Sequence, residues 1–542
     1  MPAEAVLVVD DLSLGLKGVE FRPLLERLTL TVHEGETVCL VGESGSGKSL
    51  TALATMGLLP SAVEVQGGSI MVGGKPVLGA SASAIRRMRA SSMGMIFQEP
   101  MTALNPVVTI GAQIDEVLSI HTSLGARQRR VEVLRVLEQV NLPDPAAIHD
   151  AYPHQLSGGQ RQRAMIAMAL VLKPKILIAD EPTTALDVTT QRQILSLIKE
   201  LQTTYRMGVL FITHDMGVVA DIADRVVVLK QGRTVETGSV RQILEAPSED
   251  YTRELLQSVP SLVPAEPRRE SPADPVLRVS DLSKHYGSRS LFGTRRKVAA
   301  AVDVAFAIRP GRTLGIVGES GSGKSTVARC VMRLLEPDTG AIRVDDTDIA
   351  RSPERELHAV RRKIQLVFQD PYRSLNPRIR IGESVIEGLV NFGFARSDAI
   401  AKARALLDRV GLPANAVERY PHEFSGGQRQ RIAIARALAL SPSLIVADEA
   451  VSALDVVIQK QVLDLLRDLQ DEFGIAMLFI THDLRVAAQI CDDILVMKAG
   501  RVVEAGPAAQ VLGNPAHHYT RELIQAAPGR HWDFANFRPI AA

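Results

Sequence analysis

The residues best suited to chemistry lie in the segment GESGSGKS, which occurs at Gly42–Ser49 and again at Gly318–Ser325. It fits the pattern GxxxxGK[ST], in which glycines turn backbone N–H groups toward phosphate oxygens. The lysine reaches the β- and γ-phosphates, and the last hydroxyl ligates magnesium. Two copies predict two bound nucleotides. The predicted contact residues are Gly42, Ser44, Gly45, Gly47, Lys48 and Ser49, then Gly318, Ser320, Gly321, Gly323, Lys324 and Ser325.

Each phosphate loop needs a strand before it and a helix after it. The runs TVCLV at 37–41 and TLGIV at 313–317 predict buried parallel strands, because both are continuously apolar. Residues 50–58 and 326–335 have helical patterns. A helix beginning at the loop adds the partial positive charge of its N-terminus to the phosphate site.

Two acidic residues follow another apolar run in each half, in ILIADE at 176–181 and LIVADE at 444–449. We predict that Asp180 and Asp448 hold Mg²⁺, directly or through water, and that Glu181 and Glu449 polarise the attacking water. The alternative is that these acids only cap the following turn. A phosphate loop in the same half favours the catalytic interpretation.

Composition narrows the class of protein. The chain has 542 residues and a formal charge of +1, from 62 basic and 61 acidic residues, which disfavours a nucleic-acid partner.

The cysteines, Cys39, Cys330 and Cys491, have no CxxC spacing, so we interpret them as small buried residues in a reducing compartment. The N-terminus lacks the basic region of a signal peptide, and no apolar run reaches the roughly 18 to 20 residues that a membrane span needs.

The motifs recur in the same order at nearly constant spacing, which indicates a tandem fusion of one domain. We predict an α/β fold with a parallel core, an antiparallel β subdomain opening at 6–14 and 276–282, and a helical subdomain including 127–140 and 399–410. Five prolines within 259–275 predict a stiff, extended, solvated connector. The predicted domains are 1–258 and 276–528, with the connector at 259–275 and a tail at 529–542.

The segments QLSGGQRQR at 155–163 and EFSGGQRQR at 423–431 resemble the signature motif of ABC ATPases. The resemblance implies tandem P-loop domains with RecA-like cores, in which the signature of one domain completes the ATP site of the other. Lys48 would then work with the second signature and Lys324 with the first. Arg161, Arg163, Arg429 and Arg431 either form a solvated helix face or have a further role. The implied signature contacts are Ser157, Gly158, Gly159 and Gln160, and Ser425, Gly426, Gly427 and Gln428.

Other elements match the same family. Gln98 and Gln369 resemble the glutamine that contacts magnesium and couples the site to a membrane partner. His214 and His482 resemble the switch histidine at the γ-phosphate, although a histidine at a strand end is by itself more often structural. The ALD segments at 185–187 and 453–455 resemble the loop that crosses the dimer interface.

The two halves differ at the expected adenine platform. Tyr286 occupies this place in the second half, whereas Leu16 is the matching residue in the first unless Phe21 substitutes. The loss of one stacking contact weakens binding by about 0.5 to 1.5 kcal/mol. No catalytic acid is lost in either half, so we expect two hydrolytic sites.

A closer resemblance is to dipeptide and oligopeptide importers. It rests on EPMTALNPV at 99–107 and DPYRSLNPR at 370–378, and on PSEDYTRELL at 247–256 and PAHHYTRELI at 515–524. The fused chain without clustered cysteines resembles the microcin C and antimicrobial-peptide uptake branch, so no iron-sulfur cluster is expected.

This resemblance implies an ATPase at the cytoplasmic face of the inner membrane, with two permease subunits and a periplasmic or lipid-anchored peptide-binding protein. Glutathione, nickel chelates and opine-like compounds remain alternative cargoes. The alternative function is a soluble tandem ATPase acting on ribosomes or nucleic-acid complexes. We interpret the tail around Trp532 as a loosely docked terminus, with a specific partner contact as the alternative.

Overall fold

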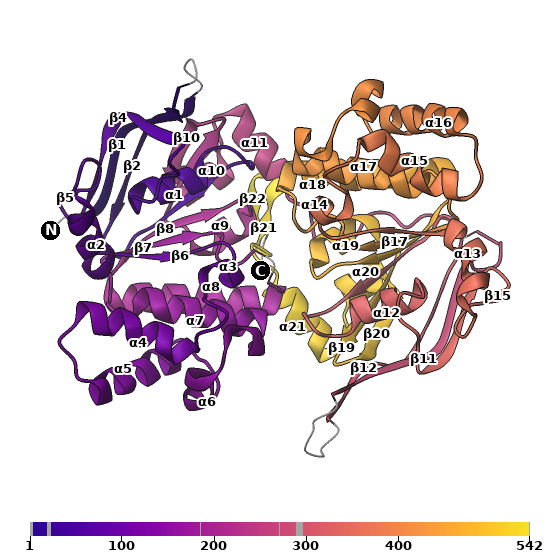
Figure 1. The fold of residues 1–542 in the computed structure, drawn as a ribbon, viewed down its shortest axis with the longest axis horizontal. Helices are drawn as coiled ribbons and strands as arrows, with labels where there is room; N and C mark the ends of the chain where they lie inside the picture. The colour runs from indigo at the N-terminus through magenta and orange to yellow at the C-terminus, as the bar shows by residue number, and fades with distance from the viewer. Residues whose placement is uncertain (1–3, 19–22, 185, 270, 289–295, 541–542) are drawn as a thin grey trace. The chain divides into compact units, whose positions relative to one another are not determined.

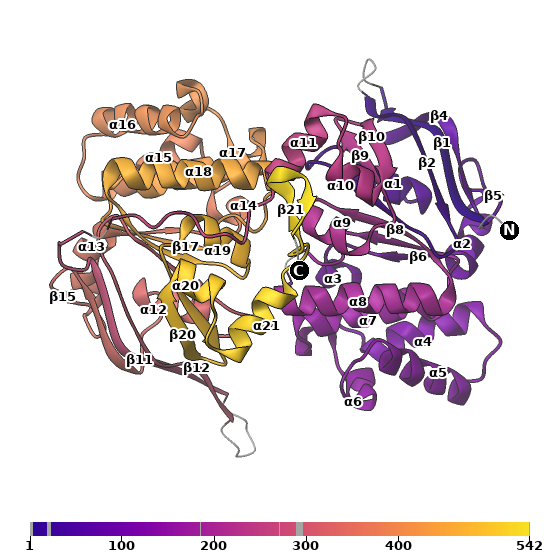
Figure 2. The same cartoon turned by 180° about the vertical axis from the view of Figure 1, so that it is seen from behind.

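The computed structural model describes residues 4–18, 23–184, 186–269, 271–288 and 296–540. Contacts divide the chain into two units. Unit 1 comprises Met1–Leu186, Thr190–Val259 and Pro528–Ala542, and unit 2 comprises Asp187–Thr189 and Pro260–Ala527. Figures 1 and 2 show the elements of both units from opposite sides.

Unit 1 is built on a ten-stranded sheet in the order β5-β4-β1-β2-β10-β9-β3-β8-β7-β6. Strands β9, β3, β8, β7 and β6 run parallel, and β1, β2, β4 and β5 form an antiparallel extension. Every residue of β3, β7 and β8 is buried, which explains their continuous apolar sequence. The strands are β1 (Ala5–Leu16), β2 (Pro23–His33), β3 (Thr37–Val41), β4 (Val63–Val72), β5 (Lys75–Pro76), β6 (Met93–Ile96), β7 (Ile176–Asp180), β8 (Gly208–Thr213), β9 (Arg225–Lys230) and β10 (Arg233–Ser239).

Helices surround this sheet, and α4, α5 and α6 pack on one another and, for α4 and α5, on α7. The predicted helical subdomain is therefore present, and its predicted segment at 127–140 is α5. The helix after the phosphate loop begins two residues earlier than the pattern indicates, at Lys48. The helices are α1 (Lys48–Thr55), α2 (Ala82–Ser91), α3 (Pro100–Ala103), α4 (Ile110–His121), α5 (Ala126–Gln139), α6 (Pro145–Asp150), α7 (Gly158–Leu170), α8 (Val188–Tyr205), α9 (Met216–Ile222), α10 (Val240–Glu245) and α11 (Asp250–Gln257).

Unit 2 repeats this plan with two sheets, β12-β11-β14-β15 and β16-β17-β18-β13-β19-β20. Its strands are β11 (Leu277–Ser288), β12 (Arg296–Ile308), β13 (Thr313–Val317), β14 (Thr339–Val344), β15 (Thr347–Asp348), β16 (Ile364–Val367), β17 (Leu444–Asp448), β18 (Ala476–Ile480), β19 (Asp493–Lys498) and β20 (Arg501–Pro507). Its helices are α12 (Lys324–Val331), α13 (Glu354–Lys363), α14 (Pro371–Ser374), α15 (Ile381–Asn391), α16 (Arg396–Arg409), α17 (Gly426–Leu438), α18 (Val456–Phe473), α19 (Leu484–Ile490), α20 (Ala508–Gly513) and α21 (His518–Ala526). The predicted α/β fold is confirmed in both units.

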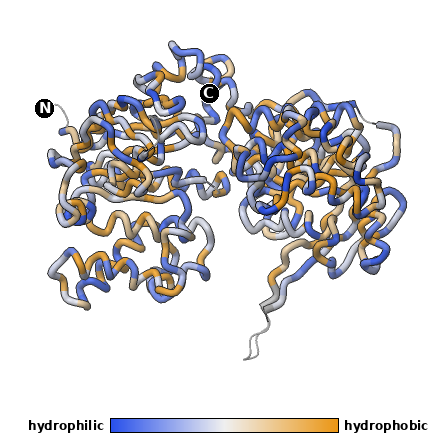
Figure 3. Tube along the Cα trace, turned by 45° about the horizontal axis from the view of Figure 1, so that its top comes forward, coloured by the Kyte–Doolittle hydropathy of each residue, from blue (hydrophilic) through white to orange (hydrophobic). Residues whose placement is uncertain are grey.

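Buried hydrophobic residues form the cores of the two units. The apolar segments that contribute them run through both units, as Figure 3 shows in orange. Cys39, Cys330 and Cys491 are all buried, as expected for small apolar residues. Within the described residues, none of the helices combines the length and hydropathy that a membrane span needs.

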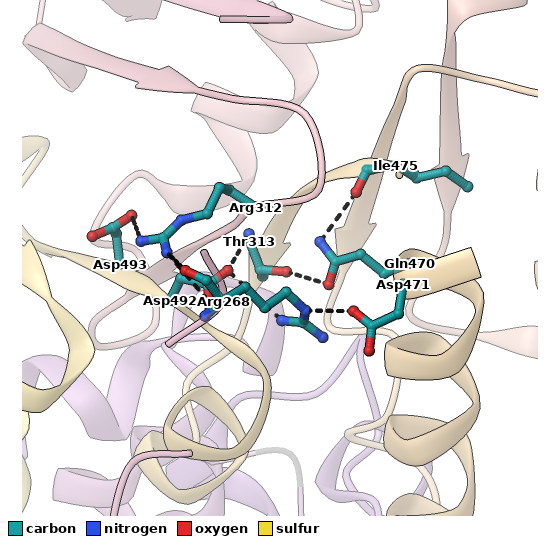
Figure 4. A network of polar contacts seen from close by, with 8 residues as sticks. All are labelled: Arg268, Arg312, Thr313, Gln470, Asp471, Ile475, Asp492 and Asp493. Carbon is teal, nitrogen blue, oxygen red and sulfur yellow. Dashed lines mark hydrogen bonds and ion pairs between the residues drawn. The ribbon is translucent and has the colours of Figure 1, made fainter. Parts of the chain in front are cut away.

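The first half of the proline-rich connector is docked on the rest of unit 2. The prediction that the connector is solvated was therefore wrong for this half. The backbone N–H of Arg268 donates to the carboxylate of Asp492 at 2.8 Å, and its guanidinium donates to Asp471 at 2.8 Å. Arg312 donates to the carbonyl of Arg268 (Figure 4). Upstream, the amide of Gln489 donates to the carbonyl of Ser261 at 2.8 Å. These bonds satisfy backbone groups that an extended segment would otherwise leave to water.

The matching positions of the two repeats carry a reversed charge pair, which includes Arg312, the donor to the connector. At the start of the phosphate-loop strand, unit 1 pairs Glu36 with Arg225 at 3.2 Å. At the matching positions, unit 2 pairs Arg312 with Asp493 at 2.8 Å. The arginine at the first position can donate to a passing carbonyl, whereas a glutamate cannot.

The C-terminal tail packs within unit 1, beside α9 in both views (Figures 1 and 2). It contains a short antiparallel pair, β21 (Trp532–Asp533) with β22 (Arg538–Pro539). The N–H of Gly529 donates to the carboxylate of Asp221 at 3.1 Å, and Phe534 is buried. The tail is thus anchored by named contacts rather than loosely docked.

Candidate ATP-binding and hydrolysis sites

Each phosphate loop joins a central parallel strand to a helix, β3 to α1 in unit 1 and β13 to α12 in unit 2. Gly42 and Gly318 have φ of 148° and 149°. A Cβ would lie 2.1 Å from the carbonyl oxygen of Leu229 in the first case and 2.2 Å from that of Met497 in the second. Only glycine fits such a contact with backbone, so these positions set how the loop leaves its strand.

The loop lysines fold back onto the loop. The Nζ of Lys48 donates to the carbonyls of Gly42 and Glu43, both at 2.8 Å. Lys324 donates to the matching carbonyls at 2.8 and 2.7 Å. Burial lowers the pKa of Lys324, while Glu449 and neighbouring carboxylates oppose that change. Each ammonium is therefore held inside the loop, where a phosphate would need its charge.

The loop serine and the first acid of each pair meet across the strand ends. The hydroxyl of Ser49 donates to Asp180 at 3.1 Å, and that of Ser325 donates to Asp448 at 3.2 Å. Burial raises the pKa of Asp180 to about 6, against the opposing effect of its bond from Ser49. Burial likewise raises the pKa of Asp448. Each unit thus places a hydroxyl and a carboxylate at one point, the oxygen donor types that a hard divalent cation prefers.

The second acid of unit 1 has three polar partners. Glu181 accepts from the amide of Gln98 at 3.1 Å and from the hydroxyl of Thr184 at 2.9 Å, and its carboxylate lies 3.2 Å from Nδ1 of His214. Burial alone would raise the pKa of Glu181, but the hydrogen bond and charge of His214 outweigh it and hold the pKa at about 2. Burial would lower the pKa of His214, and Glu181 raises it instead.

Unit 2 reproduces this cluster. Glu449 accepts from the amide of Gln369 at 2.7 Å and lies 3.3 Å from Nδ1 of His482. Against burial, His482 lowers the pKa of Glu449, and Glu449 raises the pKa of His482. The hydroxyl of Ser452 donates to the backbone carbonyl of Glu449 at 3.0 Å. The structure therefore gathers glutamine, glutamate and histidine twice, with one contact changed.

Both glutamates lie on strained backbone. Glu181 and Glu449 have φ of 46° and 50°, in the left-handed region that costs a non-glycine residue on the order of 1 to 3 kcal/mol. Their N–H groups donate to the carbonyls of Ile212 and Ile480 at 3.0 and 2.9 Å, so the adjacent strand holds the conformation. At this turn each carboxylate meets its glutamine and its histidine.

Each signature segment forms the first turn of a helix with a reciprocal cap. The Ser157 hydroxyl accepts from the N–H of Gln160 at 3.3 Å, and the Gln160 side chain accepts from the N–H of Ser157 at 2.9 Å. Ser425 and Gln428 repeat this at 3.3 and 3.0 Å. The glycine N–H groups between them belong to the first helical turn, whose donors have no partner within the helix. The turn is therefore suited to bind an anion.

The arginines after each signature are not merely a solvated face. Arg161 donates to the carbonyls of Pro153 and Leu156 at 2.9 and 3.0 Å. Arg163 donates to the carbonyl of Val140 at 2.8 Å. In unit 2 Arg429 and Arg431 make the matching bonds to Pro421 and Val410, and Arg429 also stacks on Tyr372. These side chains fix the approach to the signature turn, because they hold carbonyls of the preceding segments.

The residues predicted for the two adenine platforms are described in part. Tyr286 is 43% exposed on β11, as an aromatic platform must be. Its counterpart Leu16 ends β1. Phe21 and Ala185, named for the first adenine platform and the first ALD segment, lie outside the described residues.

Two residues at the phosphate loops were not among the predicted site residues. Tyr251 and Tyr519 place their hydroxyls at the N–H groups of Glu43 and Glu319, at 3.2 and 3.1 Å. Both belong to the repeated YTREL segment, which was the available signal. Nothing in that segment indicates which part of the fold the tyrosine contacts.

Comparison with known proteins decides the family. The family model described as "ABC transporter" matches residues 25–184 and 301–452, and the model described as "Oligopeptide/dipeptide transporter, C-terminal region" matches 235–299 and 503–536. This chain belongs to the ABC transporter family. The ABC ATPase matches cover both phosphate loops and both acid pairs.

Relatives of this ABC ATPase carry a more specific name. The glutathione import ATP-binding proteins GsiA of Shigella dysenteriae serotype 1 (strain Sd197) and Escherichia coli (strain K12) are both 49% identical to it, each alignment covering 97% of this chain and 90% of the relative. A solved structure titled "Dimeric Structure of MJ0796, a Bacterial ABC Transporter Cassette" is 28% identical, with a TM-score of 0.39, covering 43% of this chain and 98% of that one.

The family and the importer-type C-terminal regions define the general activity. This ABC ATPase is an ATP-binding and ATP-hydrolysing subunit of the dipeptide/oligopeptide importer type. Such a subunit acts with membrane permeases and a substrate-binding protein. The matches favour this function over an ATPase of ribosomes or nucleic-acid complexes.

Proposed function

We propose that this chain is the motor of a peptide importer, with two ATP sites that are each shared between the domains at 1–258 and 276–528. The observation that carries the proposal is the repeated cluster of loop serine, paired acids, glutamine and histidine. In unit 1 these residues are Ser49, Asp180, Glu181, Gln98 and His214. Unit 2 holds the same residue types at matching places.

Glu181 and Glu449 would accept the proton of the attacking water. A carboxylate with a pKa of about 2, as at Glu181, is ionised but a weak base. Transfer of His214 from the glutamate to the γ-phosphate would remove the main stabilising charge and make Glu181 a stronger base. The histidine would thus couple the arrival of the γ-phosphate to the activation of water, and His482 would do so for Glu449.

The donors present support the proposal of two magnesium sites. Ser49 with Asp180, and Ser325 with Asp448, supply the hydroxyl and carboxylate oxygens that magnesium takes alongside nucleotide phosphates. Gln98 and Gln369 donate through their amide nitrogens to the glutamates that directly follow these aspartates, and their amide oxygens could supply a further ligand. Magnesium, when bound, neutralises charge on the phosphates.

The signature turns would complete the two sites. We propose that Ser425–Gln428 binds the nucleotide held by Lys48, and that Ser157–Gln160 binds the one held by Lys324. Helix starts with free N–H donors support this arrangement. Closure on two ATP molecules would then move the permeases, and hydrolysis would reopen the pair.

The partners and cargo follow from the importer type. We propose two permease subunits, a periplasmic or lipid-anchored binding protein, and a place at the cytoplasmic face of the inner membrane. Peptides are the proposed cargo, and glutathione, a small peptide named for the relatives, is a specific candidate.

The test is ATP hydrolysis by the purified chain carrying Glu181→Gln and Glu449→Gln together. Loss of two general bases is expected to reduce kcat by at least about 10²-fold while ATP still binds. Glu200→Gln, an exposed glutamate on α8, is the matched control and should hydrolyse normally. Unchanged kcat in the double variant would refute the assigned roles.

A further inference from the structure

The C-terminal element of each repeat touches the phosphate loop through one hydroxyl. Tyr251 on α11 accepts from the N–H of Glu43, 208 positions away, at 3.2 Å. Tyr519 on α21 accepts from the N–H of Glu319, 200 positions away, at 3.1 Å. The two tyrosines are only 5% and 1% exposed. The same contact, formed independently in two units, is a feature of the repeat and not of one loop conformation.

Each tyrosine ring is also held by the strand that abuts the loop. The Nζ of Lys230 lies 4.1 Å from the ring centroid of Tyr251, and that of Lys498 lies 4.3 Å from the ring of Tyr519. The residue before each lysine supplies the carbonyl that forces glycine at the start of the loop. Strand end, loop and tyrosine therefore form one packed cluster, in which the ring cannot shift without moving the lysine.

The hydroxyl acts on a peptide group that also holds the loop lysine. In the peptide joining Gly42 to Glu43, the carbonyl accepts from Lys48 at 2.8 Å and the N–H donates to Tyr251. The peptide joining Gly318 to Glu319 has the same two partners, Lys324 and Tyr519. Rotation of either peptide plane would break both bonds at once. The tyrosine thus fixes the direction of the carbonyl on which the lysine rests.

We propose that Tyr251 and Tyr519 are positioning residues for ATP binding, acting through the first peptide of each phosphate loop. This assigns a task to the importer-type C-terminal element, namely to pre-organise the phosphate loop for the triphosphate. The inference rests on the proposed function, since it concerns the same nucleotide sites. Pre-organisation strengthens binding because less freedom is lost when the ligand arrives.

The test removes each hydroxyl while keeping the ring. Tyr251→Phe is made in a Lys324→Ala background and Tyr519→Phe in a Lys48→Ala background, so that one site at a time reports. Tyr205→Phe is the matched control in both backgrounds, because its hydroxyl donates to Gln139 at 2.9 Å away from the loops. The measurements are Kd for trinitrophenyl-ATP, KM and kcat for ATP where the background hydrolyses it, and Tm.

Loss of the hydroxyl's hydrogen bonding to the loop is expected to raise Kd about two- to tenfold in each Tyr→Phe variant, with KM following and kcat nearly constant. The control should keep Kd within about twofold of its parent. Unchanged Kd in the Tyr→Phe variants, or the same rise in Tyr205→Phe, overturns the inference alone. A natural chain that binds no ATP overturns the proposed function together with it.

Discussion

Adjacent glycines in the signature turn should have separable roles, and alanine substitutions can test this. Gly158 and Gly159 are the first two residues of α7. A Cβ on Gly158 would lie 3.9 Å from the nearest atom, a methyl of Leu186, which is ordinary contact. A Cβ on Gly159 would lie 2.6 Å from Cγ2 of Thr190 on α8. The first glycine has room for a methyl group and the second does not.

The magnitude follows from this geometry. Thr190 is β-branched and helical, so its methyl cannot rotate away cheaply, and α7 must shift instead. Such overpacking costs about 1 to 3 kcal/mol. For a unit of this size each kcal/mol lost from the free energy of unfolding lowers Tm by about 2 to 4 °C. The Tm of Gly159→Ala should therefore fall by about 2 to 12 °C. Gly158→Ala should stay within about 2 °C of the natural chain.

ATP hydrolysis should be affected in the opposite order, with Gly158→Ala losing more activity than Gly159→Ala. If the exposed start of α7 closes on a nucleotide, a methyl group at Gly158 blocks the close backbone approach and ATP hydrolysis falls by at least about tenfold. Unit 2 offers an internal repeat of the experiment. A Cβ on Gly427 would lie 2.3 Å from Ile458, whereas one on Gly426 would lie 4.0 Å from Tyr372.

The assay is differential scanning calorimetry with ATP turnover on the same four single variants. Equal Tm losses in both members of a pair would refute the packing argument. Retained turnover in Gly158→Ala and Gly426→Ala would refute the role of the turn in closing the site.

Further predictions concern the site and the connector. In the protein free of nucleotide and metal, Glu181→Gln should lower Tm more at pH 6 than at pH 9. The reason is that Glu181 raises the pKa of His214 in the folded state. The resulting stabilisation is present below pH 6.5, the ordinary pKa of histidine, and is lost as the pH rises through the folded-state pKa. A difference in Tm between the variant and the natural chain that grows toward pH 9 would contradict this pH dependence. Arg268→Ala should remove the side-chain ion pairs of the connector with Asp471 and Asp492 while keeping its backbone bonds. Proteinase K cleavage of the connector should become about fivefold faster, for a loss of about 1 kcal/mol. Arg269→Ala, an exposed neighbour, is the control and should cleave at the natural rate.

Features that depend on residues close together in the chain could be predicted from the sequence. A strand, a glycine-rich turn and a helix start are encoded within a few residues, so β3, the loop at 42–49 and α1 could be predicted together. The capped signature turns are equally local, because Ser157 and Gln160 satisfy each other within one turn. The tandem fold and its family also followed, since both depend on the order of such motifs.

Contacts between segments far apart in the chain could be seen only in the folded structure. The hydroxyl of Tyr251 reaches the loop only because β9, β10 and α10 return the chain there, and no spacing in the sequence encodes that return. One of the bonds that dock Arg268 comes from Arg312, and the matching position in unit 1 carries the opposite charge, at Glu36. Whether a polar or glycine residue is free or engaged is set by atoms far away in the chain, and packing is what brings those atoms together.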